Sequence, residues 1–266
     1  MNATASPAPD TSSDLRLVLP GRIASLGAGV AWFSGGWKLF VRAPLMWIIS
    51  IILVFICVVA VSLVPILGQI AVNLLQPVIL AGFMIACHSL ERGGEFELDH
   101  LLGGFKKEFG NLVIVGLIFL GIAIVIAIVS FTFIAVTVGT AFLTGDPEQA
   151  LATLMGSALA ALLGVLIMLA LLVPLFAAYW FAPVLVVMHG MSPVEAMKAS
   201  FFACFRNFFS MLVYGIVMIP LAILAAIPFG LGFLVLVPMT IASIYVSYRE
   251  IFTEEAAPVP AKPTFA

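Results

Sequence analysis

Six long runs of apolar residues restrict the fold of this chain more than any other feature of its sequence. A transmembrane helix needs roughly 20 predominantly apolar residues, and each run approaches or exceeds that length. No Asp, Glu, Lys or Arg interrupts any of the runs. The expected spans cover residues 43–64, 67–90, 112–143, 155–188, 208–228 and 231–248.

The overall composition decides whether lipid or water surrounds these runs. Hydrophobic residues make up 64% of the chain and charged residues 9%, whereas a soluble domain is about half apolar and about a quarter charged. In lipid, only helices and closed barrels satisfy every backbone hydrogen bond, and a barrel would show short alternating segments. The predicted fold is therefore all-α, a polytopic transmembrane helix bundle of about six spans that forms a single domain over residues 16–252.

Two boundaries of this domain rest on local composition. Residues 1–15 and 253–266 are rich in Ala, Pro, Ser and Thr, so both tails are expected to be disordered. The last two spans are divided only by Ile227–Gly230, where Pro and Gly favour a helix break. A five-span chain is the alternative if that break does not form.

The eleven Lys and Arg residues predict the orientation of the spans. They lie in the amino-terminal segment, the second and fourth loops and the carboxy-terminal segment, and the other three loops contain none. Basic residues concentrate on the cytoplasmic side of membrane proteins, so we expect six spans with both termini in the cytoplasm. A five-span chain would place Arg249 and Lys262 on the opposite side. The formal net charge of −2 favours no nucleic-acid partner.

Each of the three basic cytoplasmic segments has the spacing of an amphipathic helix. Such helices either lie in the inner-leaflet interface or pack on the cytoplasmic ends of the bundle. Their apolar stripes are Ile23, Leu26, Val30, Phe33, Trp37 and Phe40; Leu98, Leu101, Leu102, Phe105 and Phe109; and Val194, Met197, Phe201, Phe205 and Phe208. The expected interfacial anchors are Trp32, Trp37, Lys38, Arg42, Lys106, Lys107, Lys198 and Arg206. The third helix is expected to begin at a capping box formed by Ser192–Glu195.

The same order of segments recurs three times along the chain. A basic–aromatic helix leads into a hairpin of two spans, and the second span of each hairpin contains a proline, namely Pro77, Pro183 or Pro238. This order indicates a threefold internal repeat. It describes an architecture and no activity, because internal repeats occur in membrane proteins of several functions.

Three polar side chains form the best candidate for a functional face inside the spans. Gln69, Asn73 and Gln76 lie four and three residues apart, which places them on one face of the second span. Either they line a polar path or hold a solute near the outer leaflet, or they form interhelical hydrogen bonds that only stabilise the bundle.

The fourth span is distinguished by its start and its length. Its first turns carry a strip of small residues, Ala152, Gly156, Ala160 and Gly164. Such a strip allows a close helix–helix approach, and the partner is either the third span or a second copy of the chain. Asp146–Gln149 has the pattern of a helix start outside the membrane. A helix from there to the end of the span would be roughly 60 Å long, so it must tilt, kink at Pro174 or Pro183, or project.

Ionisable and nucleophilic residues are few and scattered. His88 and His189, at the cytoplasmic ends of two spans, either sense pH or meet a ligand, or they are interfacial histidines with a polar neighbour. Cys57, Cys87 and Cys204 lack the spacing of a disulfide framework or a metal cluster. The sequence contains no P-loop, HExxH or GxSxG motif. We therefore expect no enzyme activity, no cofactor and no metal.

Two stretches carry a family resemblance: Gly36–Phe40 followed by Pro44, and His189–Asn207 followed by Tyr245–Arg249. Together they resemble an uncharacterised family of proteobacterial inner-membrane proteins of unknown function, over residues 21–252. This resemblance implies a location in the inner membrane and implies no functional residue.

A second, more distant similarity rests on Ser192–Ser200, which has the pattern Ser-Pro-x-Glu-Ala-x-x-x-Ser. It is similar to the membrane domain found beside bacterial glycerophosphodiester phosphodiesterases. The catalytic barrel attached to that domain has no counterpart in this sequence. The similarity therefore implies no phosphodiesterase activity.

Three hypotheses for the function follow, of which the third is an enzyme subunit whose chemistry resides in a partner chain. The first is a non-enzymatic component that organises the lipid bilayer, other membrane proteins or further copies of itself through the aromatic–basic cytoplasmic surface. The second is a small permease or exporter for a lipidic or weakly polar solute, which would use the polar face of the second span. Replacing the three polar residues of that face by Leu should change stability alone under the first hypothesis and abolish transport under the second.

Overall fold

The computed structural model describes residues 15–143 and 150–255, and most of these residues are helical. The predicted all-α fold is confirmed. In chain order the elements are β1 (Leu15–Leu17), α1 (Ala28–Arg42), α2 (Pro44–Ser62), α3 (Leu67–Glu91), the 3₁₀ helix η1 (Leu98–Leu102), α4 (Gly103–Lys106), α5 (Phe109–Leu143), α6 (Ala150–Trp180), α7 (Ala182–His189), α8 (Pro193–Arg206), α9 (Phe208–Ala226), α10 (Phe233–Phe252) and β2 (Thr253–Glu255).

Six helical stretches of the described chain are long and apolar enough to cross a membrane. They are Pro44–Ser62, Leu67–Glu91, Phe109–Val136, Met155–His189, Phe208–Ala226 and Phe233–Phe252. Their limits lie within a few residues of most of the predicted ranges. A turn separates α9 from α10, as the Pro and Gly of that segment predicted, so the described part of the chain has six such helices in place of five.

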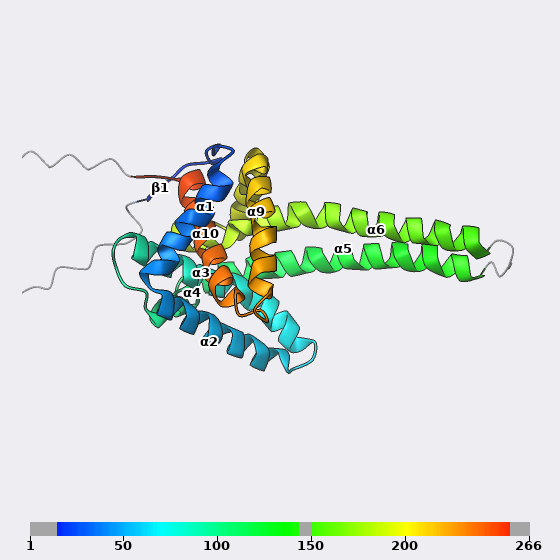
Figure 1. Ribbon diagram of the computed structural model, residues 1–266, viewed down its shortest axis with the longest axis horizontal. Helices are drawn as coiled ribbons and strands as arrows, with labels where there is room; N and C mark the ends of the chain where they lie inside the picture. The colour runs from blue at the N-terminus through cyan, green and yellow to red at the C-terminus, as the bar shows by residue number, and fades with distance from the viewer. Residues whose placement is uncertain (1–14, 144–149, 256–266) are drawn as a thin grey trace, which may run out of the picture.

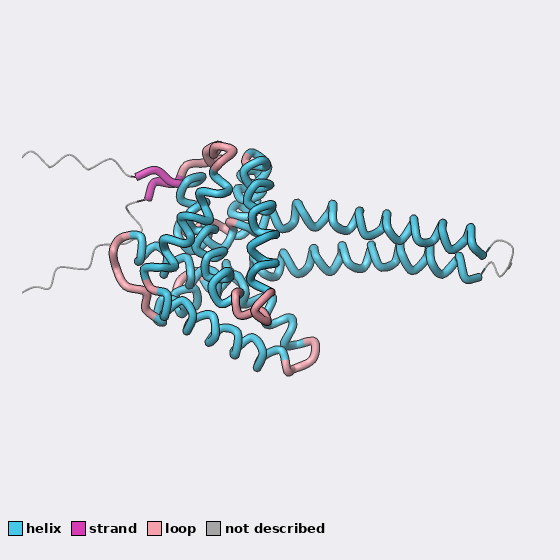
Figure 2. The backbone as a smooth tube through the Cα atoms, in the orientation of Figure 1, coloured by secondary structure: helices cyan, strands magenta, loops and turns pink. Residues whose placement is uncertain are grey.

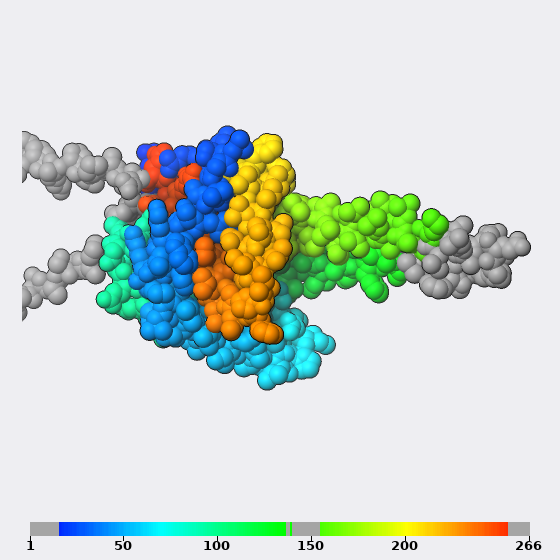
Figure 3. All heavy atoms as spheres, viewed as in Figure 1, coloured from blue at the N-terminus to red at the C-terminus, as the bar shows by residue number. Residues whose placement is uncertain are grey.

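Three hairpins, α2–α3, α5–α6 and α9–α10, extend from a compact body (Figure 1). α5 and α6 lie side by side and reach far beyond the other helices, and α9 runs across their direction. The loops gather at the body and at the hairpin turns (Figure 2). Figure 3 shows the coloured part of the α5–α6 hairpin as a narrow projection from the body. We call residues 121–143 and 150–172 the arm and the remainder the body.

The body is organised by the short helices that precede the hairpins. Each of them packs on the second helix of the preceding hairpin: η1 and α4 on α3, α8 on α6, and α1 on α10. The last of these contacts closes a ring between the two ends of the chain. A Cβ atom at Gly36 would lie 2.6 Å from the Met239 carbonyl oxygen, and one at Gly104 would overlap the Val78 carbonyl. This regular arrangement supports the predicted threefold repeat.

The short helices bury only part of the predicted apolar stripes. Phe33, Phe40, Leu101 and Met197 are buried, whereas the exposed stripe residues are Ile23, Leu26, Val30, Trp37, Leu98, Leu102, Phe105, Phe109, Val194, Phe205 and Phe208. The exposed positions agree with helices that lie in the inner-leaflet interface, and the buried positions agree with helices that pack on the bundle. The buried faces also carry small residues, among them Gly29 and Gly36 in α1 and Ala196 and Ala203 in α8. Small residues let two backbones approach closely, whereas lipid accepts large apolar side chains as readily as protein does.

The start of α8 agrees with the prediction in position and differs from it in hydrogen bonding. Pro193 occupies the first helical turn as expected. The Ser192 hydroxyl, however, makes no hydrogen bond with the helix backbone and lies 2.7 Å from the Glu195 carboxylate, to which it donates. The predicted capping box is therefore wrong, because the two side chains satisfy each other.

The fourth span is interrupted where α6 meets α7. Pro183 lies in the first turn of α7, so the kink occurs at one of the two predicted prolines. The Ser200 hydroxyl accepts a hydrogen bond from the Phe181 N–H (2.9 Å) and donates one to the Ala177 carbonyl (2.6 Å). These two backbone groups would pair with each other in a continuous helix. Ser200 thus inserts into the hydrogen-bond ladder and stabilises the kink.

The two described ends of the chain lie side by side (Figure 1). β1 and β2 pair antiparallel, with Arg16 opposite Glu254, and the Val18 N–H donates to the Phe252 carbonyl (2.8 Å). The prediction of disordered tails is therefore wrong for Leu15 and for Thr253–Glu255, because each strand supplies the backbone partners of the other. Residues 1–14 and 256–266 of the predicted tails lie outside the described residues.

Candidate functional site

The most polar part of the body lies where α3 and α10 end side by side. The Glu91 carboxylate accepts a hydrogen bond from the Tyr245 hydroxyl (2.6 Å) and forms a salt bridge with Arg249 (2.9 Å). The Tyr245 hydroxyl also lies 3.0 Å from Nδ1 of His88, which is buried. We call these four residues the Glu91 cluster. It joins two spans that are far apart in the sequence, and its single ion pair is electrically balanced.

Two further polar pairs continue this region along α10. His189 Nε2 lies 2.7 Å from the Tyr248 hydroxyl. Both predicted histidines thus have a polar neighbour, as one of the two interpretations expected. The Trp32 indole N–H donates to the Glu250 carboxylate (2.7 Å), and the Trp32 side chain is 1% exposed. The prediction of Trp32 as an interfacial anchor is wrong, because its N–H finds a partner inside the protein.

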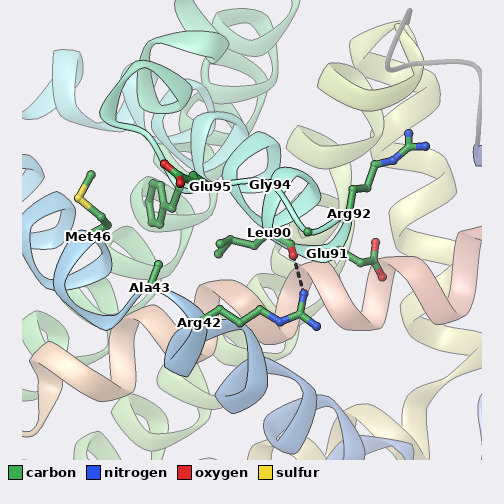
Figure 4. A pocket seen from close by; sticks show the side chains of 10 residues that line it. Arg42, Ala43, Met46, Leu90, Glu91, Arg92, Gly94 and Glu95 are labelled. Atoms are coloured by element: carbon green, nitrogen blue, oxygen red, sulfur yellow. Dashed lines mark hydrogen bonds between the residues drawn. The ribbon is translucent and has the colours of Figure 1, made fainter.

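A polar pocket of about 670 Å³ opens beside the Glu91 cluster. It is lined by the end of α1, the start of α2 and the loop that follows α3. The Arg42 guanidinium donates to the Leu90 carbonyl (2.5 Å), so this predicted anchor holds α1 against α3 (Figure 4). Figure 4 also shows Arg92 directed away from Glu95. The lining of the pocket includes two arginines and two glutamates, so the pocket favours neither anionic nor cationic ligands.

A second cavity, of about 650 Å³, lies among the spans between α2, α3, α6 and α10. Of the predicted polar face, only Gln76 lines it. Gln69 is exposed, and the Asn73 side chain donates to the Gln69 carbonyl within the same helix (2.8 Å). The structure therefore does not bring the three residues together at one site. Within the described part of the chain, none of their side chains forms the interhelical hydrogen bond that the structural interpretation expected.

Tyr179 is the residue of this cavity that the sequence analysis missed. Its side chain is 9% exposed, and its hydroxyl has no hydrogen-bond partner among the described residues. Buried hydroxyl groups nearly always have a partner, so this one is unusual. A signal was present, since a tyrosine inside an apolar span places a hydrogen-bonding group where no neighbouring residue in the run can satisfy it.

The predicted strip of small residues faces the third span at one position. A Cβ atom at Gly164 would lie 2.8 Å from a side-chain atom of α5, and Ala160 is half-buried. A Cβ atom at Gly156 would meet nothing within 4 Å. The third span is therefore the partner at Gly164. The side chain of Ala152 and the predicted helix start at Asp146–Gln149 lie outside the described residues.

The other predicted anchors lie on the surface of the body. Trp37 is 46% exposed, and Lys106 forms a salt bridge with Asp99 (2.5 Å). The exposed aromatic residues of this region are Trp37, Phe105, Phe109, Phe202, Phe205, Phe208 and Phe209. The exposed basic residues beside them are Lys38, Arg42, Lys106, Lys107, Lys198 and Arg206. We call these two sets the aromatic–basic collar.

Cys204 is a nucleophilic residue outside the apolar spans. Its thiol is buried and donates to the Ala177 carbonyl (3.5 Å). Burial raises the pKa of this thiol to about 12. The thiol is therefore protonated at neutral pH, which makes it unreactive as a nucleophile. No three His, Cys, Asp or Glu side chains in the described ranges come together in a way that would hold a metal ion.

The six helical stretches of the described chain that are long and apolar enough to cross a membrane define a polytopic integral membrane protein. Residues 33–255 match the family described as "Protein of unknown function (DUF975)", and the chain belongs to that family. It is also similar to a probable inner membrane protein of Burkholderia thailandensis, with 30% identity across 90% of this chain and 96% of that protein. No solved structure matches the chain. The predicted family of inner-membrane proteins of unknown function is thereby confirmed.

Proposed function

We propose that this protein is a non-enzymatic inner-membrane component that organises anionic lipid in the cytoplasmic leaflet through its aromatic–basic collar. The observation that carries the proposal is the outward position of large aromatic side chains beside Lys and Arg on the short helices. Aromatic rings are favoured at the headgroup level, and cations near the surface attract anionic lipids. Small residues of α1 and α8 are buried against the body, and Trp37, Phe202 and Phe205 lie on the exposed sides of these helices.

A cytoplasmic position for the collar is part of the proposal. The basic residues cluster in the segments that the positive-inside rule assigns to the cytoplasm. The pairing of β1 with β2 supports the placement of both ends on the same side of the membrane, because it brings the described ends of the chain together. Both termini would then be cytoplasmic.

A non-enzymatic role agrees with the hydrogen bonds and ion pairs that the polar groups of the body already form with each other. The Glu91 carboxylate is already bonded to Tyr245 and Arg249, and His189 is bonded to Tyr248. Such mutually satisfied groups stabilise a structure and leave no free base or nucleophile at that place.

The experiment compares lipid retention by the wild type and by a variant in which Lys106, Lys107, Lys198 and Arg206 are replaced by Gln. Each protein is placed in nanodiscs of phosphatidylglycerol and phosphatidylcholine, and the lipids that remain bound are identified by native mass spectrometry. Each basic residue near the surface contributes about 1 kcal/mol of attraction to anionic lipid. The variant should therefore lose at least about tenfold in preference for phosphatidylglycerol.

A matched control changes basic residues of the terminal segments, with Arg16 and Lys262 replaced by Gln. It should keep the preference of the wild type for phosphatidylglycerol. Equal retention of both lipids by the wild type, or an unchanged preference in the fourfold variant, would contradict the proposed function.

A permease for a lipidic or weakly polar solute is the second candidate, and a single observation favours it: Gln76 lines a cavity among the spans. Loss of transport in a folded Gln76→Leu variant would favour the permease over the lipid-organising role. The distant similarity of Ser192–Ser200 to the membrane domain of bacterial phosphodiesterases stays a prediction and agrees with either role.

A further inference from the structure

The polar pocket between α1, α2 and the loop after α3 lies at the ends of two spans. Its volume of about 670 Å³ falls within the roughly 300–1,000 Å³ that small-molecule sites occupy. α2 begins at Pro44, directly after the pocket residues Arg42 and Ala43. α3 ends at Glu91, which lines the pocket together with Arg92. The ends of transmembrane helices lie at the level of the lipid headgroups, so the pocket lies at that level as well.

Opposite charges line this pocket without neutralising each other. The Arg42 guanidinium donates to the Leu90 carbonyl and forms no salt bridge with a described residue. The Glu95 carboxylate likewise has no cation within salt-bridge distance in the described chain. Glu91, in contrast, is already paired with Arg249. Arg42 and Glu95 are thus available to a ligand.

The surface between these two charged groups is apolar. Leu90 and Phe96 are buried, Met46 is half-buried, and all three line the pocket. Figure 4 shows Arg42 and Glu95 on opposite sides of the Leu90 side chain. A ligand that reaches both charged groups therefore also covers apolar surface.

The outer face of α2 continues this apolar surface into the span. Leu45, Ile49, Ile52 and Leu53 are exposed large side chains on this helix. Acyl chains contact such a face through many weak dispersion contacts. An amphiphile whose polar end occupies the pocket therefore has an apolar path for its chains.

The charges of the pocket select the headgroup of such an amphiphile. A phosphate accepts charge-assisted hydrogen bonds from a guanidinium, and a primary ammonium donates them to a carboxylate. A headgroup that carries both groups matches Arg42 and Glu95. A purely anionic headgroup would be repelled by the Glu95 carboxylate, and a trimethylated ammonium has no N–H group to donate to it.

We infer that this pocket binds the headgroup of a phospholipid that carries a phosphate and a primary ammonium group, as phosphatidylethanolamine does. The phosphate meets Arg42, the ammonium meets Glu95, and the acyl chains follow the outer face of α2. The inference goes beyond the proposed function, because the collar recognises negative charge alone. Arg42 belongs to both sites, and the fourfold variant that tests the collar leaves it unchanged.

The test is native mass spectrometry of the full-length protein in nanodiscs with equal amounts of phosphatidylethanolamine, phosphatidylcholine and phosphatidylglycerol of identical acyl chains. Arg42 and Glu95 are exposed, so the wild type should retain phosphatidylethanolamine about three- to fivefold over phosphatidylcholine, the range of one exposed ion pair. Glu95→Gln should bring this ratio close to one, because it removes the charge of the acceptor and keeps its size.

Glu97→Gln is the matched control, since it makes the same change in the same loop at a residue that does not line the pocket. Glutamine keeps a side-chain oxygen that can cap η1, as Glu97 does. This variant should retain the lipids in the ratio of the wild type. A folded Glu95→Gln variant with the ratio of the wild type would overturn the inference.

A series of methylated headgroups separates hydrogen bonding from charge. Retention by the wild type should fall stepwise from phosphatidylethanolamine through its N-methyl and N,N-dimethyl forms to phosphatidylcholine. Each methyl group removes one N–H donor and leaves the charge unchanged. Equal retention across the series would contradict the contact between the ammonium and Glu95.

Arg42→Gln tests the contact with the phosphate. It should reduce the retention of phosphatidylethanolamine and phosphatidylcholine alike, by about three- to fivefold, because both lipids carry the phosphate. Lys38→Gln, on the same helix outside the pocket, should retain both lipids as the wild type does. Unchanged retention by Arg42→Gln, or a lost preference between the two lipids, would contradict this role of Arg42.

Two further comparisons separate the lipid from a free ligand and the pocket from the collar. Soluble phosphoethanolamine has the same charged groups without acyl chains, so it should not displace the retained lipid. Displacement would indicate a soluble ligand and contradict the assignment to a lipid. The fourfold collar variant should lose its preference for phosphatidylglycerol over phosphatidylcholine and keep that for phosphatidylethanolamine. Loss of the latter preference in this variant would overturn the inference and leave the proposed function standing.

Discussion

The carboxy-terminal span α10 and the fourth span, most of which lies in the arm, are both apolar helices in very different surroundings. Half of the most apolar window of α10 is buried, compared with 11% of that of Met155–His189. The mean hydropathy of these windows is 1.3 for α10 and 2.9 for the fourth span. The less apolar helix is thus the buried one, which is the reverse of the order expected for a protein in water.

The difference shows what holds each region in place. Lipid surrounds a purely apolar helix without cost, so the arm needs few protein contacts beyond the partner helix of its own hairpin. α10 carries Tyr245, Tyr248 and Arg249, and their polar groups find partners on α3 and α7. The body is therefore stabilised by specific hydrogen bonds and close backbone contacts, and the arm mainly by its surroundings.

The largest expected effect is an all-or-none difference in accessibility between the turn of the arm and the carboxy terminus, which should lie on opposite sides of the membrane. A reporter that is active only in the cytoplasm should be active when it is fused after Ala266. A cysteine at Gly145 should react with an impermeant maleimide in spheroplasts, because the positive-inside rule predicts that the basic segments face the cytoplasm. Periplasmic activity of the reporter, or labelling at 145 only after lysis, would contradict the orientation. A cysteine at Lys107 is the control and should react only after lysis.

The Glu91 cluster should dominate the stability of the body. Arg249→Leu should lower the free energy of unfolding by about 2–3 kcal/mol, since it leaves a partly buried carboxylate without its cation. Unfolding in detergent measures the loss. Lys106→Leu is the matched control, because its salt bridge with Asp99 is exposed and should contribute about 0–1 kcal/mol. Equal losses of unfolding free energy in the two variants would show that the Glu91 cluster stabilises the protein no more than an exposed ion pair does.

Glycine-to-alanine substitutions should have opposite effects in the body and in the arm. Gly36→Ala should cost about 1–3 kcal/mol, because its Cβ would press on the Met239 carbonyl. Gly121→Ala should be neutral or stabilise by up to about 1 kcal/mol, because nothing lies within 4 Å of its Cβ and alanine favours the helix. Thermal unfolding in detergent compares the two. A destabilised Gly121→Ala variant would indicate that the arm packs against a further partner.

The smallest effect is expected at the kink of the fourth span. Ser200→Ala should lower the stability by about 1 kcal/mol, since the Phe181 N–H and the Ala177 carbonyl lose their shared partner. Ser192→Ala, at the exposed residue that directly precedes the same helix, is the control and should change stability less. An unchanged Ser200→Ala variant would show that Pro183 alone maintains the kink.

The sequence predicted the helices better than their faces. Each span was visible as a run of apolar residues, because the tendency to enter lipid depends on local composition. The break between α9 and α10 and the kink at Pro183 were also local signals. The stripes of α1 and α8 are only partly buried, because a search for large apolar side chains also finds the lipid-facing side of a membrane helix, whereas small residues such as Gly36 and Ala203 face protein.

The candidate sites were predicted only in part for a related reason. Gln76 was recognised as a polar residue in a span, and the structure assigns it to a cavity. Gln69 and Asn73 share its helix face but do not line the cavity. Tyr179 could be recognised as a site residue only after α2, α3, α6 and α10 had been placed around it.

Sequence alone determined that this chain is an all-helical membrane protein with six spans, because the exclusion of water from apolar runs needs no knowledge of their neighbours. Tertiary structure decided which residues meet: Glu91 with Arg249, Trp32 with Glu250, and Tyr179 with an apolar cavity. Hydrogen bonds and close packing act only over a few ångströms, and these partners are separated in the sequence by up to 218 residues. Only the folded chain brings such groups within reach of each other.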